Sequence, residues 1–257
     1  MLKAVLGAST LALTLFSGAS QAQTQPIKEI VLVHGAFVNG AGWKPVYDIL
    51  TKDGYQVSIA EHPLTSFSAD VTAVKRTIDA LPGPVLLVGH SYGGAIITDA
   101  GNDPKVKGLV YIAAHALDKG ETEKANGKRF PNSARPLRKS ADGYLTIAPA
   151  NYPADFAADL PTAQASFEAD AQEWTNASVF AAVAGEPAWR HKPTWYAVAK
   201  MDKIINPNLE RMYAKRAHAH TIEIAGASHS VYESHPQQVA ALIEEAARQA
   251  LNDKAMD

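Results

Sequence analysis

The sequence predicts an α/β protein, with a mostly parallel, doubly wound sheet covered by helices and an inserted helical lid. Short apolar runs rich in Val, Ile and Leu alternate with segments of helical periodicity near both ends of the chain. Continuous apolar strands of this kind are typical of a parallel sheet buried on both faces. The alternation stops from about residue 117 to 191, and this is where we expect the lid.

Residues 1–22 have the pattern of a secretory signal peptide. Lys3 precedes a mostly apolar run over 4–16, and the small residues Ser20 and Ala22 stand where a signal peptidase reads the chain. We expect cleavage after Ala22 and export to the periplasm or the medium. The alternative is a short hydrophobic N-terminal anchor, although the run is short for a membrane span.

The composition narrows the classes of function. The 257 residues include no cysteine and carry a formal net charge of −2. Disulfides and thiolate metal sites are therefore excluded. The chain also lacks the excess of positive charge that is typical of proteins that bind nucleic acids or anionic membranes. Residues 23–257 are enough for one domain with a sizeable core, so the segment at about 117–191 is interpreted as an insertion into that domain.

The first part of the chain alternates strand and helix. An apolar strand over 28–34 runs into a glycine-containing loop over 34–42, and a helix is expected over 43–51. A second strand follows over 55–60. Apolar residues then recur at helical spacing, which predicts an amphipathic helix; they are Val71, Val74, Ile78 and Leu81.

The stretch 84–100 organises the rest of the chain. An apolar strand over 84–88 turns abruptly at Gly89-His90-Ser91-Tyr92-Gly93 and continues as a helix over 94–100. A Gly-x-Ser-x-Gly turn between a strand and a helix is a nucleophile elbow. The turn lifts the Ser91 hydroxyl clear of the sheet and places it at a helix N-terminus, where negative charge is favoured.

The insertion separates this half from a second α/β stretch. A strand over 108–114 precedes it; its first part, 119–140, is polar and basic, and its second part, 152–184, is Ala-rich with helical patterning. We interpret the basic residues as a solvated loop, with an anion-binding site as the alternative. After the insertion the pattern resumes with a strand over 193–199, a helical face over 209–217, a strand over 221–224 and a last helix over 239–246.

A serine hydroxyl needs a base to become a nucleophile, and the base needs a third group to orient it. His229 lies in a loop between the short strand and the last helix, which is where the base belongs in the chain order serine, acid, histidine. Asp202, just after the strand over 193–199, is the candidate acid. Asp118, after the preceding strand, is the alternative.

The same chemistry requires an oxyanion hole. One donor is expected to be the backbone N–H of Tyr92, directly after the nucleophile. The second should come from the loop after the first strand, and we expect it to be Ala36, with Phe37 as the alternative. His34 is expected to hold that loop by hydrogen bonding, and His90 to point away from the serine. The remaining histidines are interpreted as loop or surface residues without metal-type spacing; they are His62, His115, His191, His218, His220 and His235.

These motifs together resemble the α/β-hydrolase superfamily. The resemblance rests on His-Gly-Ala-Phe at 34–37, the turn at Ser91, Asp202 before Ile-Ile-Asn-Pro, and Ser228-His229, and it spans residues 23–257 in the right order. The chain is most similar to small bacterial esterase-like members, akin to plant methyl-ester esterases and hydroxynitrile lyases. The resemblance implies the α/β-hydrolase fold, the lid, and a triad of Ser91, Asp202 and His229.

The resemblance also implies hydrolysis of a small or medium carboxylic ester through an acyl-enzyme, with no cofactor and no metal. A serine at the elbow argues against dehalogenase and epoxide hydrolase activity, which use an aspartate there. Other chemistries on the same triad stay open, namely a lactonase, an amidase or a cofactor-free perhydrolase; a ligand receptor with a vestigial triad is a further alternative. Some aromatic residues of the lid region are expected to supply pocket walls and most to be core, without any one being singled out; they are Phe130, Tyr144, Tyr152, Phe156, Phe167, Trp174, Phe180 and Trp189.

Overall fold

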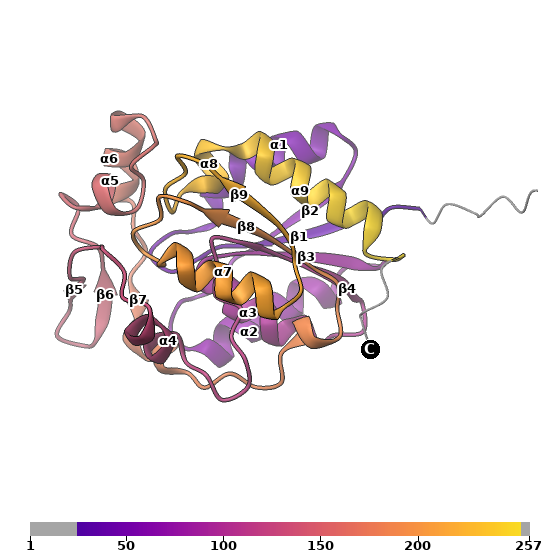
Figure 1. Ribbon diagram of the computed structural model, residues 1–257, viewed down its shortest axis with the longest axis horizontal. Coiled ribbons are helices and arrows are strands. Elements are labelled where there is room, and N and C mark those ends of the chain that lie inside the picture. The colour runs from indigo at the N-terminus through magenta and orange to yellow at the C-terminus, as the bar shows by residue number, and fades with distance from the viewer. Residues whose placement is uncertain (1–24, 253–257) are drawn as a thin grey trace, which may run out of the picture.

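Six parallel strands form the centre of the computed structural model, which describes residues 25–252 (Figure 1). Their order in the sheet is β2-β1-β3-β4-β8-β9, and every neighbouring pair is parallel. β3 and β8 are buried along their whole length, as their apolar sequences predict. The strands are β1 (Glu29–Val33), β2 (Gln56–Ala60), β3 (Val85–His90), β4 (Val106–Ile112), β8 (Thr194–Ala199) and β9 (His220–Ile224).

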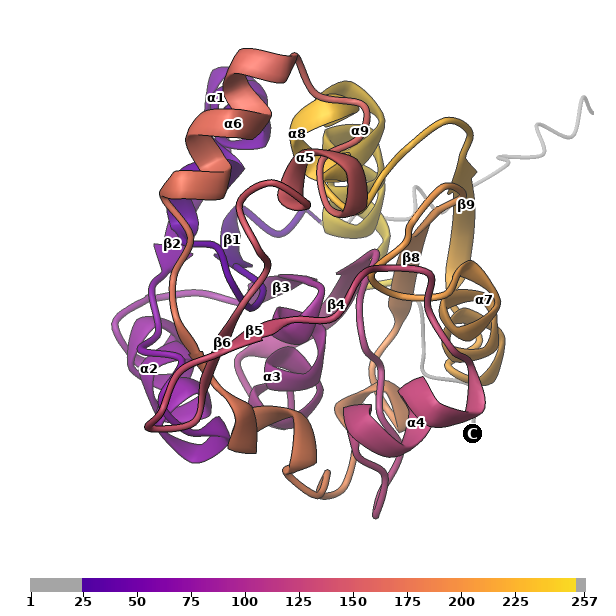
Figure 2. The ribbon, with the colours of Figure 1, turned by 90° about the vertical axis from the view of Figure 1, so that its left-hand side faces the viewer.

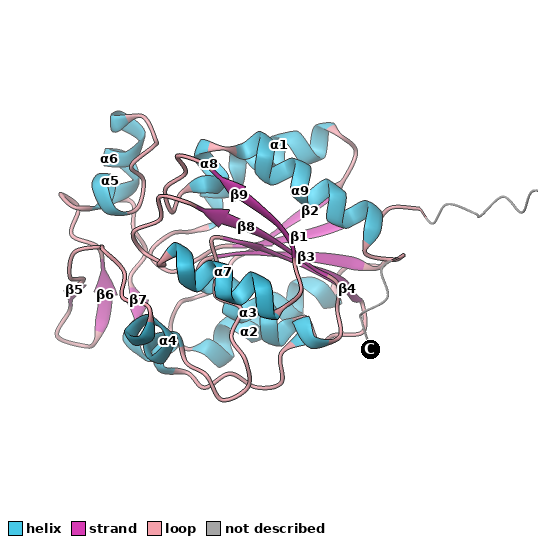
Figure 3. Cartoon of the chain, viewed as in Figure 1, coloured by secondary structure: helices cyan, strands magenta, loops and turns pink. Residues whose placement is uncertain are grey.

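Helices cover both faces of this sheet, so two apolar cores lie on its two sides (Figures 1 and 3). α1 and α9 pack on one face, where Trp43 and Trp195 are completely buried. α2, α3 and α7 pack on the other face, around Tyr111 and Tyr196. The helices are α1 (Lys44–Lys52), α2 (Phe67–Asp79), α3 (Tyr92–Ala100), α7 (Pro207–Arg216) and α9 (Pro236–Gln249), with the short η1 (Gly40–Trp43) before α1 and α8 (Val231–Ser234) before α9.

The segment between β4 and β8 forms a cap at the carboxyl ends of the strands (Figure 2). It contacts the loops that follow those strands: Thr175 hydrogen-bonds the loop after β1, and Asp159 binds Ser228 after β9. Its helical elements are α4 (Glu123–Arg129), α5 (Tyr152–Asp155), α6 (Thr162–Asp170), η2 (Ala177–Ala181) and η3 (Ala188–Arg190), and its strands are β5 (Arg138–Lys139), β6 (Tyr144–Thr146) and β7 (Thr175–Asn176).

The α/β fold class is thus confirmed, while the cap is not purely helical. β5, β6 and β7 form a small antiparallel sheet. These strands have two or three residues each, too few for an alternating pattern to stand out in the sequence. Part of the basic stretch 119–140 also folds as α4, whose start is capped by the Thr122 side chain.

The signal peptide expected over 1–22 lies outside the described residues. Among residues 25–252, no helix has both the length and the apolar character needed to cross a bilayer.

Candidate active site

Ser91 sits in a strained turn between β3 and α3. Its φ and ψ are 53° and −123°, values that side-chain-bearing residues rarely adopt. A Cβ atom at Gly93 would lie 2.5 Å from the backbone oxygen of His34, and one at Gly89 would lie 2.6 Å from the backbone oxygen of Gly93. Because these obstacles are backbone atoms that cannot swing away, both positions of the elbow require glycine.

The structure brings Ser91, His229 and Asp202 together from three loops at the carboxyl ends of β3, β9 and β8. The Ser91 hydroxyl lies 2.9 Å from His229 Nε2, and His229 Nδ1 lies 2.5 Å from Asp202 Oδ2. The other carboxylate oxygen of Asp202 accepts the backbone N–H groups of Ile204 and Ile205, at 2.7 and 2.9 Å. A neutral His229 in this arrangement can take the serine proton, while Asp202 fixes the ring orientation.

The His229 ring is held by its neighbours. The Phe156 ring meets it edge-on, with 4.6 Å between ring centroids. His90 Nε2 donates to the backbone oxygen of His229 at 3.0 Å, and the two rings lie 4.7 Å apart between centroids, so His90 packs against the residue that we assign as the base. Burial, reinforced by the nearby His229, keeps the pKa of His90 well below its usual range, and His90 acts as a neutral brace.

Glu210 on α7 is a neighbour of the site that the sequence did not single out. Its side chain is completely buried, and Oε2 accepts the Ala199 N–H at 3.1 Å. Burial, and then the adjacent Asp202 carboxylate, raise the pKa of Glu210 well above its usual range. The protonated form of Glu210, which carries no charge beside Asp202, is therefore favoured. In the sequence, the burial of Glu210 is indicated only by its place on the apolar face of the helix that Leu209 and Tyr213 define.

The backbone distinguishes the two candidates for the second oxyanion donor. The Phe37 N–H already donates to Thr175 Oγ1 at 3.0 Å. Among the residues that the structure describes, no acceptor is found for the N–H groups of Ala36 and Tyr92. Gly35 brings the loop against the nucleophile, since a Cβ at this position would lie 2.8 Å from Ser91 Cβ. This geometry favours Ala36 and Tyr92 over the alternative, Phe37.

The alternative acid, Asp118, lies elsewhere. Its Oδ1 accepts a hydrogen bond from Arg190 at 2.6 Å, and the pair is partly exposed on the cap. His62 is a loop residue, as expected, but it does not lie at the surface: its side chain is fully buried and stacks on His34 with 3.8 Å between ring centroids. Burial also lowers the pKa of His115 to about 3. Within residues 25–252, no group of three or more potential ligands is placed to hold a metal ion.

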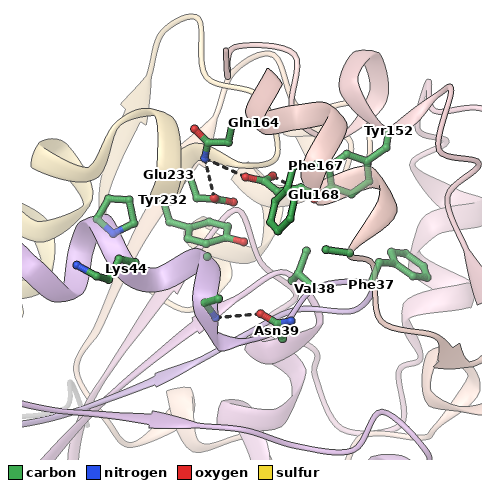
Figure 4. A pocket seen from close by; sticks show the side chains of 14 residues that line it. Phe37, Val38, Asn39, Lys44, Tyr152, Gln164, Phe167, Glu168, Tyr232 and Glu233 are labelled. Carbon is green, nitrogen blue, oxygen red and sulfur yellow. Dashed lines mark hydrogen bonds between the residues drawn. The ribbon is translucent and has the colours of Figure 1, made fainter. Parts of the chain in front are cut away.

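A cavity of about 450 Å³ lies between α6 of the cap and the start of α1 (Figure 4). Phe37, Phe167, Tyr152 and Tyr232 contribute aromatic walls. Ser91 and His229 are not among its lining residues, but Tyr152 stacks on Phe156, the ring that contacts His229. Along this path the rings of Tyr152 and Phe156 lie between the cavity and His229.

The polar end of this cavity holds two carboxyl groups. Gln164 donates to Glu168 at 2.9 Å and to Glu233 at 3.2 Å, as the dashed lines in Figure 4 mark. Burial, and then the proximity of Glu168, raise the pKa of Glu233 to about 9. Glu233 is therefore neutral at neutral pH, and the remaining walls of the cavity are mainly apolar and aromatic.

Comparison with known proteins places these features in a family. The model of the alpha/beta hydrolase family matches residues 30–242. A carbendazim-hydrolyzing esterase from Nocardioides sp. (strain SG-4G) is 31% identical over 106 residues, which cover 36% of this chain and 44% of that protein. The chain thus matches less than half the length of this relative.

Two solved structures show the same fold. A pyrethroid hydrolase from Sphingobium faniae JZ-2 superposes with a TM-score of 0.70 at 21% identity, covering 86% of this chain and 97% of that one. A methylesterase from Arabidopsis superposes with a TM-score of 0.71 at 17% identity, covering 86% of this chain and 98% of that one.

Proposed function

The chain belongs to the alpha/beta hydrolase family, and we propose that it is a serine esterase that cleaves a carboxylic ester of a small or medium substrate. The observation that carries the proposal is the continuous contact from Ser91 through His229 to Asp202, at 2.9 and 2.5 Å, on a strained elbow. The relative from Nocardioides, whose name records an esterase, supports the reaction class.

The reaction follows from these positions. Ser91 Oγ bonds to the acyl carbon while His229 Nε2 takes its proton, and the carbonyl oxygen becomes an oxyanion held by the N–H groups of Tyr92 and Ala36. The bond to the alcohol breaks, and the alcohol leaves with the proton from His229. Water then attacks the acyl-enzyme with the same help, which releases the carboxylic acid and restores Ser91.

We place the larger part of the substrate in the cavity between α6 and α1, because Phe37, which follows the Ala36 donor, is one of its walls. A volume of about 450 Å³ suits a group the size of an aromatic ring with short substituents. The aromatic walls from Phe37, Tyr152 and Phe167 favour an apolar or aromatic group over a charged one.

The test is hydrolysis of chromogenic esters from acetyl to palmitoyl, with a lactone and carbendazim, by the wild type and by Ser91→Ala. We expect turnover of the shorter esters, and a loss of several orders of magnitude in Ser91→Ala. Equal turnover by the two proteins would place the activity elsewhere. A folded wild-type protein that cleaves none of these compounds would contradict the general esterase.

We also propose that the protein is exported by cleavage after Ala22. Mass spectrometry of the protein produced in a bacterial host tests this. A mature chain that begins at Gln23 in the periplasmic fraction is expected, and a full-length chain in the cytoplasm would contradict it.

A further inference from the structure

A buried carboxylate lies behind the oxyanion site. Asp70, on α2, is completely buried, and no lysine or arginine among residues 25–252 forms an ion pair with it. Its Oδ2 accepts a hydrogen bond from the Tyr92 hydroxyl at 2.6 Å, and its Oδ1 accepts the Leu64 N–H at 2.8 Å. Burying a carboxylate without a cation costs free energy unless hydrogen bonds satisfy it, so the position calls for an explanation.

One contact of Asp70 leads to the first oxyanion donor. Tyr92 follows the nucleophile, and its backbone N–H is the donor at the start of α3. Its ring lies among the aromatic rings of His62, Phe67 and Phe180, with centroid distances of 6.0, 6.4 and 6.1 Å. The hydrogen bond to Asp70 fixes the far end of that ring and, through it, the orientation of the residue whose N–H faces the oxyanion.

The loop of the second donor is held by His62, which packs beside Asp70 without a hydrogen bond to it. His62 Nε2 donates to the backbone oxygen of His34 at 3.1 Å, so the neutral ring has no proton on Nδ1, which lies 3.5 Å from Asp70 Oδ1. That oxygen is two residues before Ala36. The His34 ring stacks on His62 with an interplanar angle of 8°, which adds a second contact to the same loop.

We infer that Asp70 is a positioning residue for the oxyanion hole, and that it acts on the Tyr92 donor. It holds Tyr92 directly through the hydrogen bond to the Tyr92 hydroxyl, whereas the loop that carries Ala36 is held by the separate hydrogen bond from His62. The inference rests on the proposed function. Asp70 does not touch the substrate; it acts because oxyanion donors stabilise the transition state only when they are held at the right distance and angle.

Two variants separate positioning from general stability. Asp70→Asn keeps the size of the side chain and replaces the carboxylate by an amide. Tyr92→Phe removes only the hydroxyl that donates a hydrogen bond to Asp70. Asp99→Asn is the matched control, because Asp99 pairs with Lys75 at the partly exposed side of α3, away from the triad.

The measurements are kcat and KM on an acetyl ester, together with the rate at which a fluorophosphonate probe labels Ser91. In labelling, Ser91 Oγ bonds to phosphorus, fluoride leaves, and the phosphoryl oxygen takes the place of the oxyanion. We expect Asp70→Asn and Tyr92→Phe each to lower kcat and the labelling rate about 10- to 100-fold, somewhat less than the loss of a donor. KM should stay within about threefold, and Asp99→Asn should match the wild type.

The double variant gives a second readout. If Asp70 acts through Tyr92, the losses should not multiply, and Asp70→Asn with Tyr92→Phe should be about as slow as the slower single variant. Rates per labelled active site within about twofold of wild type in both single variants would overturn the inference, whatever their thermal stability. Should Asp70→Asn not fold, Tyr92→Phe alone decides. A wild-type protein that neither reacts with the probe nor cleaves esters would instead overturn the proposed function, and this inference with it.

Discussion

The backbone N–H of Phe37 donates to Thr175 Oγ1 at 3.0 Å, joining the loop after β1 to a strand of the cap 138 residues later. The Phe37 oxygen accepts the Glu173 N–H at 3.0 Å, so the cap binds both polar backbone groups of this residue. Phe37 has a φ of 69°, a conformation that tertiary contacts must maintain. The cap therefore helps to shape the loop in which we place the oxyanion donor.

Removing this link should destabilise the protein. Thr175→Val keeps the shape of the buried side chain but leaves the Phe37 N–H without an acceptor, which typically costs about 1–3 kcal/mol. A lower urea midpoint and a reduced kcat are expected. Thr72→Val, an exposed threonine that bonds only within its own helix, is the control. Equal midpoints for the two variants would show that the link contributes nothing.

The acid of the triad can be tested against its alternative. Asp202→Asn removes the charge that orients His229, and triads of this kind lose about 10³- to 10⁴-fold in kcat on such a change. Asp118→Asn should lose only an ion pair on the cap and keep its activity within about twofold. Steady-state kinetics on one ester decides between them. The reverse order of the two losses would reassign the acid.

Stability should depend on pH through a buried acid of the cap. Burial raises the pKa of Glu123 from 4.5 to about 8. A raised folded-state pKa means that the stabilising contribution of the protonated form is complete below pH 4.5 and is lost as the pH rises through about 8. Glu123→Gln removes this titration. The melting temperature of Glu123→Gln should therefore rise relative to that of the wild type as the pH increases from 4.5 to about 8. Thermal melts from pH 4 to 9 measure it, with Glu245→Gln on α9 as the control. A constant difference between wild type and Glu123→Gln would contradict the assignment.

The cavity predicts a specificity variant. Phe167 lines the cavity but is 72% exposed, so Phe167→Ala should fold normally and weaken only the binding of bulky groups. Loss of part of a phenyl contact is worth about 1 kcal/mol, or a three- to tenfold rise in KM for an aromatic ester. The acetyl ester should be unaffected. Val183→Ala changes an equally exposed apolar residue of the cap that does not line the cavity. If both variants alter KM alike, the cavity does not hold the substrate.

Much of the fold follows from local patterns in the chain. Buried parallel strands are continuous apolar runs, so β1, β3 and β8 stand out. Their carboxyl ends meet at one edge of the sheet, and this allowed Ser91, Asp202 and His229 to be predicted as neighbours before any distance was known. The elbow could also be predicted from the sequence, because a side chain at either of its glycines would clash with nearby backbone atoms.

The sequence by itself therefore determined the sheet, the elbow and the three residues that meet there. Tertiary structure decided which N–H of the loop is free, since Thr175 engages Phe37 from the cap. It also decided that Arg190 draws Asp118 away from His229, and that His62 is buried beside Asp70. These choices depend on contacts between residues far apart in the chain. Such contacts leave no periodic or local signal in the sequence, whereas strands and turns can be predicted from the spacing of residue types along the chain.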